Sequence, residues 1–380
     1  MNERPILPAE DTLDKESFVF VGESWSPGAE FNAKPVGFFR DALARLCRNV
    51  PSVIAFFVIV LVVFLALFAP GFNAYGFNEQ NTDRVNMPPR VQGLENLGIL
   101  NGSRVLTNRR TEYFGDTEKY PEGAILSYDN IRTIRGVEIA DVTVNYYVFL
   151  GADDEYYWMG TDYLGRDLFT RLFVGARVSL LIAVLSVLIN AVIGVVYGAV
   201  AGYYGGKVDM IMMRITEVLG SVPNIAVVTM FILFFGTGIL SVILALVVQG
   251  WIHAARLTRA QFYRLKVREY VLAARTLGTG DRALIFRHIL PNAIGPLITT
   301  AMIAIPGAIF AESFLAYIGL GIKAPLASIG VLLAEAQKNL MSLPYQTFFP
   351  AALISLLMIA FNMFANGLRD AFDPSQRGKD

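Results

Sequence analysis

The sequence predicts an all-α polytopic membrane protein with about six transmembrane helices. Apolar residues make up 54% of the chain and charged residues only 17%, whereas an ordinary soluble domain has roughly 45–50% and about 25%. The apolar surplus is gathered in uninterrupted runs of about 20 residues, the length that crosses the hydrocarbon core of a bilayer. The first run begins near Val50, too far along the chain for a cleavable secretory signal. It is therefore expected to be an uncleaved span in contact with membrane lipid.

The apolar runs give the boundaries of the expected spans. The third run contains Pro223, with Arg214 and Glu217 near its start. Because these two charged residues are three apart, a helix would bring them together as a structural ion pair. The expected spans cover residues 50–69, 178–203, 210–235, 239–255, 293–318 and 348–366.

Positive charge in the short connections sets the orientation of the spans. The stretch after the fourth run is rich in lysine and arginine between Arg256 and Arg287, with only Glu269 and Asp281 as acidic residues. We therefore expect it on the cytoplasmic side, which also puts both termini inside and residues 70–177 outside. The formal net charge of the whole chain is zero, and no nucleic-acid partner is expected.

The outer segment, residues 70–177, is expected to be a small β-rich insertion. It is too long for a structureless connection in a compact protein. From Val142 to Val148, valine or tyrosine recurs at every second position, which is the period of a strand. Residues 124–128 and 131–139 have a similar character. Cys47 is the lone cysteine, so neither an internal disulfide nor a multi-cysteine metal site is expected. The alternative to a β-rich insertion is that residues 70–177 form a partly disordered loop.

Glycines recur at intervals of four in the second run, at Gly194, Gly198 and Gly202. On a helix they would lie on one face and let another helix approach closely. A tight helix–helix contact is the favoured interpretation. The alternative is that glycine is simply common in membrane spans.

A charged segment at residues 160–180 leads into the second run. Asp162, Arg166, Asp167 and Arg171 recur at spacings of four or five, so an interfacial helix would pair them across successive turns. Gly165 interrupts this pattern. The segment is interpreted as a charged, amphipathic entry to the span, with no catalytic role.

The most informative segment is the basic loop from Glu269 to Pro291. Ala273 and Ala274 are small residues on a helix expected to begin around Lys266. Two glycines within residues 276–280 then end this helix.

A second short helix is expected after the glycines. Asp281 would be its N-cap, since an aspartate side chain accepts hydrogen bonds from free backbone amides. The helix would run toward His288, with Pro291 at the transition into the next span. Two short amphipathic helices joined by a glycine turn suit docking into a groove on a partner. The alternative is a helix pair resting on anionic lipid.

This loop resembles the cytoplasmic signature of permease subunits in ATP-driven, binding-protein-dependent importers. The signature is a Glu-Ala-Ala element, a glycine four residues on, and a Leu-Pro pair further downstream. The matching residues here are Ala273, Ala274, Gly278, Leu290 and Pro291.

Two positions depart from the signature, and several other strings support the resemblance. Leu272 stands where the consensus has glutamate, and His288 stands where isoleucine is usual. The string HILPN, residues 288–292, is common in the oligopeptide and dipeptide branch of the family. Further strings that resemble this branch, in family order over residues 160–374, are GTDYLGRD, WIHAARLTRA, FLAYIGLGI and NGLRDAFDP.

The resemblance implies a type I ABC importer permease, which forms half of a translocation pathway and works by alternating access. It implies three kinds of partner: a homologous second permease, two ATP-binding subunits, and an extracellular or periplasmic peptide-binding protein. The chain has no G-x-x-x-x-G-K-[ST] phosphate loop. ATP and Mg would therefore be bound by the partner subunits, and this chain would be neither an enzyme nor the carrier of a cofactor or metal. The location implied is the bacterial plasma membrane.

The resemblance also implies which residues contact the ATPase. The expected coupling residues are Glu269, Ala273, Ala274, Gly278, Asp281, His288, Leu290 and Pro291. Glu312, in the fifth span, is a separate candidate, because ionisable residues inside a membrane are costly and often functional. It is expected either to face a water-filled translocation path or to form an ion pair or interface contact.

The expected layout has five parts: a cytoplasmic tail at 1–49, a span at 50–69, the insertion at 70–177, a five-helix core at 178–366 with the coupling loop at 257–291, and a second cytoplasmic tail at 367–380. Within the same transporter class, nickel or another small solute is an alternative to peptides. From a different class, the alternative is a membrane sensor or enzyme that uses the insertion. That alternative does not explain the coupling loop at Gly278.

Overall fold

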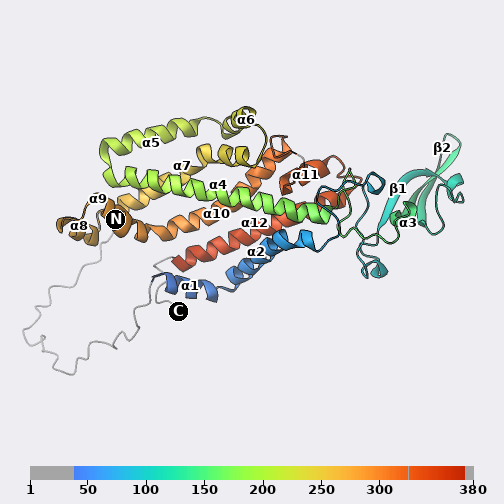
Figure 1. The fold of residues 1–380 in the computed structure, drawn as a ribbon, viewed down its shortest axis with the longest axis horizontal. Helices are drawn as coiled ribbons and strands as arrows, with labels where there is room; N and C mark the ends of the chain where they lie inside the picture. Colours follow the sequence, from blue (N-terminus) through green and yellow to red (C-terminus); the bar gives the residue numbers. More distant parts are fainter. Residues whose placement is uncertain (1–37, 324, 373–380) are drawn as a thin grey trace, which may run out of the picture.

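Long apolar helices dominate the molecule. The computed structural model describes residues 38–323 and 325–372. In this part of the chain five helices are long and apolar enough to cross a membrane, so the predicted mostly helical, polytopic fold class is confirmed. They lie side by side in one bundle, and the insertion protrudes from one end (Figure 1). The candidate spans run from Val50 to Gly71, Leu168 to Tyr204, Ile239 to Leu265, Asp281 to Tyr317 and Pro344 to Phe372.

The first two helices follow one another almost directly. Helix α1 (Phe38–Arg48) is separated by Asn49 from helix α2 (Val50–Phe68). The Asn49 side chain accepts a hydrogen bond from the backbone N–H of Ser52 at 3.2 Å, which caps the start of α2. α2 packs along helix α12 (Pro344–Phe372), where Gly367 leaves room for Ser52. Residues 1–37 and 373–380, which make up most of the two predicted tails, lie outside the described residues.

Helix α4 (Leu168–Tyr204) has 37 residues and begins well before Val178, the predicted start of the second span. The Asp167 side chain caps it by accepting a hydrogen bond from the Thr170 N–H at 2.7 Å. At 1.5 Å per residue α4 is about 55 Å long, whereas the hydrocarbon core is ~30 Å thick. Residues 168–177 of the charged segment therefore form the first turns of this helix, which extends beyond the core.

The third predicted span is wrong as a single helix. Helix α5 (Gly206–Ser221) and helix α6 (Asn224–Phe235) meet at an angle of 80°. The break falls at Val222 and Pro223, and Val222 has extended backbone angles. Proline lacks an N–H and disfavours helical angles in the residue before it, so the chain turns here. The predicted pair of Arg214 and Glu217 is present at 2.6 Å.

The fourth and fifth spans are longer than predicted. Helix α7 (Ile239–Leu265) continues past Ala255. Helix α9 (Asp281–Ala283), the π-helical segment η6 (Leu284–Ile289) and helix α10 (Leu290–Tyr317) follow without a break. The separate second short helix predicted in the basic loop is therefore wrong. Pro291 lies in the first turn of α10, a position that tolerates proline, and the wider π turn before it keeps the helix continuous. Helix α11 (Ile329–Gln337) is a short element between α10 and α12.

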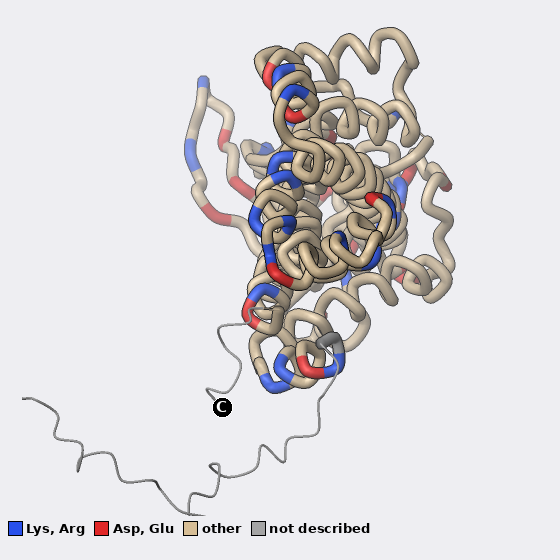
Figure 2. Tube along the Cα trace, turned by 90° about the vertical axis from the view of Figure 1, so that its left-hand side faces the viewer, with Lys and Arg blue, Asp and Glu red and all other residues tan. Residues whose placement is uncertain are grey.

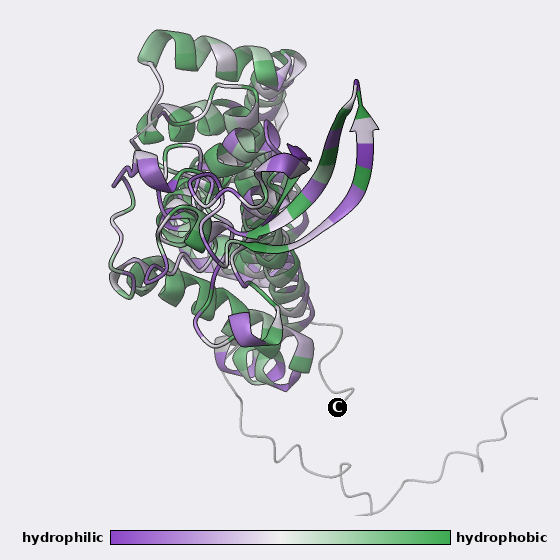
Figure 3. Cartoon of the chain, turned by 90° about the vertical axis from the view of Figure 1, so that its right-hand side faces the viewer, coloured by the Kyte–Doolittle hydropathy of each residue, from purple (hydrophilic) through white to green (hydrophobic). Residues whose placement is uncertain are grey.

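The insertion contains a three-stranded antiparallel sheet in the order β1-β3-β2, formed by β1 (Ser103–Arg110), β2 (Ile125–Ile134) and β3 (Val137–Asn145). β2 and β3 form a hairpin whose turn residues, Arg135 and Gly136, both have positive φ, as tight hairpin turns require. The hairpin projects away from the helices (Figure 3).

The strand pattern predicted around Val142 is confirmed only in part. Val142 and Val144 are buried in β3. Tyr146 belongs instead to the short helix α3 (Tyr146–Phe149), because the Asn145 side chain accepts hydrogen bonds from the next backbone N–H groups and starts a helical turn.

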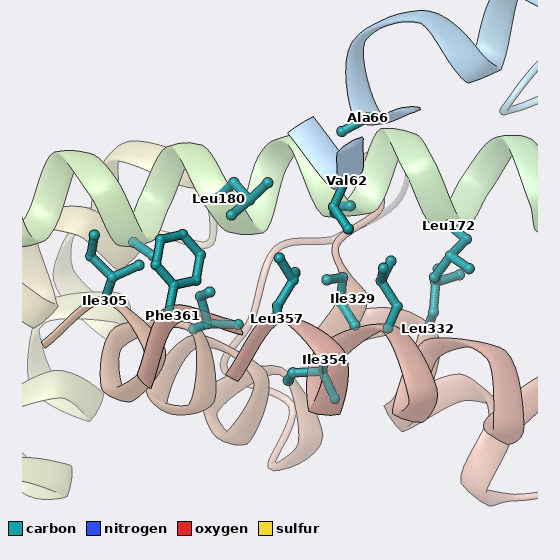
Figure 4. Close-up of a cluster of buried hydrophobic side chains, with 14 of the residues drawn as sticks. Val62, Ala66, Leu172, Leu180, Ile305, Ile329, Leu332, Ile354, Leu357 and Phe361 are labelled. Carbon is teal, nitrogen blue, oxygen red and sulfur yellow. The ribbon is translucent and has the colours of Figure 1, made fainter. Parts of the chain in front are cut away.

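The largest hydrophobic cluster lies where α2, α4, α10, α11 and α12 meet. Figure 4 shows Val62, Leu180 and Leu357 from three of these helices pointing toward one another. Many large apolar side chains elsewhere on the helices are exposed, which suits surfaces that face lipid or another subunit rather than water. Figure 2 views the end of the bundle opposite the insertion and shows lysines and arginines on the connections there.

Candidate functional site

The basic loop folds as a helix closed by a glycine turn. Helix α8 (Glu269–Thr276) ends just before Gly278, whose φ is +83°. The N–H of Gly278 donates to the carbonyl of Arg275 at 3.0 Å, and the N–H of Thr279 donates to the carbonyl of Ala274 at 3.1 Å. These bonds take up carbonyls at the end of the helix, and glycine is favoured at the left-handed position. The predicted break after α8 is confirmed.

Asp281 is not an N-cap, so this prediction is wrong. Gly280 holds the cap position, and Asp281 is the first residue of α9. Its Oδ1 atom instead accepts a hydrogen bond from the hydroxyl of Tyr203, at 2.6 Å. Arg275 donates to the same hydroxyl at 3.4 Å. Tyr203 lies at the end of α4, far away in sequence. Its hydroxyl binds the carboxylate in place of the free backbone N–H groups that an N-cap would bind.

The inner face of the loop is packed against the ends of α4 and α7. Val271 and Leu284 are fully buried and belong to one cluster with Phe262 of α7 and Tyr203 of α4. Lys266 donates from Nζ to the carbonyls of Gly202 at 2.8 Å and Tyr203 at 3.2 Å. The loop is therefore attached to two long helices of the bundle at the same place.

The outer face of the loop exposes large apolar side chains among charged ones. The side chains of Leu277, Phe286 and Leu272 are 86%, 53% and 45% exposed. Among the coupling residues expected from the resemblance, those exposed are Glu269, Ala273, Gly278, Asp281 and Pro291, and those half-buried are Ala274, His288 and Leu290. Leu277 and Phe286 were not singled out from the sequence, because exposure cannot be read from a short apolar run.

The glycines of the second span lie against α7. A Cβ atom added at Gly198 would be 2.2 Å from the carbonyl oxygen of Ala255, and one added at Gly194 would be 2.5 Å from the Cβ of Ala254. At Gly202 the Cβ of Phe262 would be 2.7 Å away. Only glycine therefore permits α4 to approach α7 this closely. The contact continues to the ends of the two helices, against which the basic loop packs.

Glu312 lies inside the bundle with no exposed surface. Its Oε2 atom accepts a hydrogen bond from the Ser179 hydroxyl of α4 at 2.9 Å, and that hydroxyl accepts from the N–H of Ile329 at 3.1 Å. Within the described residues Oε1 has no hydrogen-bond partner, and no ion pair is formed with Glu312. The side chain therefore links α10, α4 and the start of α11 in this conformation.

A buried group of charges at the other end of α4 was only partly foreseen. Arg166 pairs with Asp162 at 2.7 Å, as its spacing predicted, but in a loop rather than on a helix. Arg166 and Arg171 also reach Glu335 of α11, at 3.5 and 3.2 Å. Both arginines are 1% exposed. Burial raises the pKa of Glu335, while Arg171 and Arg166 oppose this shift. No local pattern indicated Glu335, because it is more than a hundred residues away from the two arginines along the chain.

Glu335→Gln is expected to destabilise the protein by about 1–3 kcal/mol, because two buried guanidinium groups lose one of their two carboxylates. Thermal unfolding of the purified chain in detergent measures this. Glu217→Gln is the matched control, because Glu217 forms an ion pair with Arg214 at 2.6 Å in which the two side chains are 54% and 75% exposed, and exposed pairs contribute little. Equal stability of the two variants would contradict a structural role for the buried group.

Across residues 38–323 and 325–372, no group of three or more His, Cys, Asp or Glu side chains is arranged to hold a metal ion.

Two family models match the chain. The model for the inner membrane component of binding-protein-dependent transport systems matches residues 194–378. The model for the N-terminal transmembrane domain of oligopeptide transport permease C matches residues 37–89. A chain of the MetNI methionine ABC transporter, solved in inward-facing conformations, is similar with a TM-score of 0.43 and 18% identity, over 53% of this chain and 96% of that chain.

Curated relatives match nearly the whole length. The oligopeptide transport system permease protein OppC of Bacillus subtilis is 33% identical over 96% of this chain and 99% of that protein. The dipeptide transport system permease protein DppC of Lactococcus lactis is 37% identical over 96% of this chain and 98% of that protein. DppC of Bacillus subtilis is 48% identical over 58% of this chain and 69% of that protein. The chain therefore belongs to the family of oligopeptide and dipeptide transport system permeases, the inner membrane components of binding-protein-dependent transport systems.

Proposed function

We propose that this multi-pass membrane protein imports short peptides as one of two permease subunits, and that α8 docks into a cleft of a separate ATPase. The observation that carries the proposal is the form of the basic loop. Its outer face exposes Leu277 at 86%, while its inner face is fixed to α4 by the hydrogen bond from Tyr203 to Asp281 and to α7 through the buried cluster that Val271 shares with Phe262. A movement of a docked ATPase would therefore act on two long helices together.

The remaining subunits follow from the same proposal. The ATPases, two per complex, would bind ATP and Mg. A homologous permease would complete the translocation pathway, and its contact with this chain is supported by α5 and α6, whose large apolar side chains such as Ile211 and Phe234 are 59% and 80% exposed. A peptide-binding protein would deliver substrate at the end that carries the insertion.

The proposed orientation has α8 and both termini on the cytoplasmic side of the bacterial inner membrane. It rests on the lysines and arginines around α8. In this orientation the sheet of the insertion is extracellular or periplasmic.

Purification of a tagged chain from its native membrane, followed by identification of the accompanying subunits, tests the proposal. We expect a second permease, ATPase subunits and a peptide-binding protein. Reconstituted complex is then expected to take up labelled dipeptide in an ATP-dependent manner. Uptake of nickel without uptake of peptides would contradict the proposed substrate class, and isolation without any ATPase would contradict the proposed function as a whole.

A further inference from the structure

A small cavity of about 160 Å³ lies between residues of the insertion and Asp167, the cap of α4. The start of α4 and helix α8 lie at opposite ends of the bundle (Figure 1). Its lining is rich in carboxylates and phenols. The side chains that surround it are those of Tyr75, Glu79, Asn81, Glu155, Tyr157 and Asp167.

Only one of the two carboxylate oxygens of Asp167 accepts hydrogen bonds within the described residues. The residue is 1% exposed. Its Oδ2 atom accepts hydrogen bonds from Asn73 Nδ2 at 2.8 Å and from the N–H and hydroxyl of Thr170, both at 2.7 Å. Its Oδ1 atom has no partner among the described residues. A buried carboxylate oxygen without a donor is unfavourable, so the cavity holds an acceptor that a ligand could satisfy.

The charges around the cavity are not balanced. Glu155 is paired with Arg84 at 2.9 Å. Glu79 accepts only a backbone hydrogen bond, from the N–H of Gly76 at 3.0 Å, and neither Glu79 nor Asp167 belongs to an ion pair within the described part of the chain. Burial raises the pKa of Asp167. A positive charge in the cavity would stabilise the ionised carboxylate of Asp167 and offset the cost of burying it.

Two tyrosines give the cavity an aromatic wall. The rings of Tyr75 and Tyr157 are stacked, with centroids 4.4 Å apart. Burial is the main cause that raises the pKa of Tyr75, and the carboxylate of Glu155 adds to it. Both rings are therefore neutral at physiological pH, and neutral aromatic faces attract cations.

We propose that this cavity binds a primary ammonium group, with Asp167 Oδ1 as its principal acceptor and Glu79 as a second carboxylate. An ammonium group has three N–H donors, which suits acceptors arranged around a small space. A bare metal ion suits it less, because the described residues contain no three carboxylates close enough to share one. The ammonium would come either from the N-terminus of a peptide or from a lysine side chain of a partner protein.

Thermal unfolding of the purified full chain in detergent tests this. The probes are alanyl-alanine amide, its N-acetylated form, and Nα-acetyl-lysine amide, with NaCl and CaCl₂ at matched ionic strength. We expect the two probes with a free ammonium to raise Tm by about 2–4 °C at saturation, and the N-acetylated dipeptide amide to have no effect. A response to both probes supports an ammonium site, whereas a response to alanyl-alanine amide alone would identify a peptide N-terminus as the source and a response to the lysine probe alone would identify a side chain.

Asp167→Asn is expected to abolish the increase in Tm, because asparagine lacks the negative charge. The variant is expected to fold, because asparagine remains a good N-cap for α4. Glu79→Gln, which leaves α4 untouched, is expected to weaken binding at least about tenfold, and Glu118→Gln, exposed elsewhere on the insertion, is the control with an unchanged shift. The proposal is wrong if the N-acetylated dipeptide amide stabilises equally, if only NaCl or CaCl₂ stabilises, or if both Asp167→Asn and Glu79→Gln respond like the unmodified chain.

Discussion

Replacing Leu277 with aspartate is expected to abolish ATP-driven uptake while leaving the permease folded. The side chain is 86% exposed, so the change removes no packing inside the chain. A central side chain of a protein interface contributes about 2 kcal/mol or more, which corresponds to roughly 30-fold weaker binding. A carboxylate buried in an apolar cleft without a partner adds a desolvation penalty. Uptake of labelled dipeptide by reconstituted complex, together with the affinity for the ATPase, measures both effects.

Met341→Asp is the control for this prediction. Met341 is 98% exposed and lies in the connection between α11 and α12, away from α8. The same chemical change there is expected to leave uptake intact. Unchanged ATPase affinity in Leu277→Asp would contradict docking through α8. Gly278→Trp is also expected to abolish uptake, but a side chain at a φ of +83° is strained, so that loss would combine strain with a steric block.

Local patterns predicted much of this architecture. Apolar runs identified the candidate spans because hydrophobic length is a property of consecutive residues. Gly278 marked the end of α8 for a similar reason, since a left-handed turn is a requirement of one residue. The motif strings identified the family, and relatives at 33% and 37% identity over 96% of the chain confirmed it.

The errors arose where distant residues meet. Asp281 had the spacing of an N-cap, but Tyr203 of α4 binds its carboxylate. Pro223 was recognised within the third span, but the size of the bend, 80°, was not, and α5 and α6 pack against α4 and α7. Glu312 was expected to face a water-filled path or to form an ion pair or interface contact, and its hydrogen bond to Ser179 of α4 was not foreseen. A single sequence does not contain these long-range pairings.

The second large effect is expected from Gly198→Leu, which should prevent α4 and α7 from packing. A Cβ atom at this position would be 2.2 Å from the backbone oxygen of Ala255 and 2.7 Å from the Cβ of Thr258. Overpacking of a core costs about 1–3 kcal/mol even when side chains can adjust, and here the obstructing atom belongs to a helix backbone. We expect little folded protein by size-exclusion chromatography and a Tm too low to measure.

Gly307→Leu is the matched control, because Gly307 also lies within a long helix, α10, but a Cβ there meets nothing within 4 Å. A normal Tm in Gly198→Leu would show that α4 and α7 can separate without loss of stability. The consequence would extend to the coupling loop, since the same contact continues through Gly202 to Phe262, and Lys266 there bonds to the end of α4. A smaller change, Gly198→Ala, is therefore expected to weaken the coupling of ATP hydrolysis to uptake before it unfolds the protein, because it separates the two helices on which α8 rests.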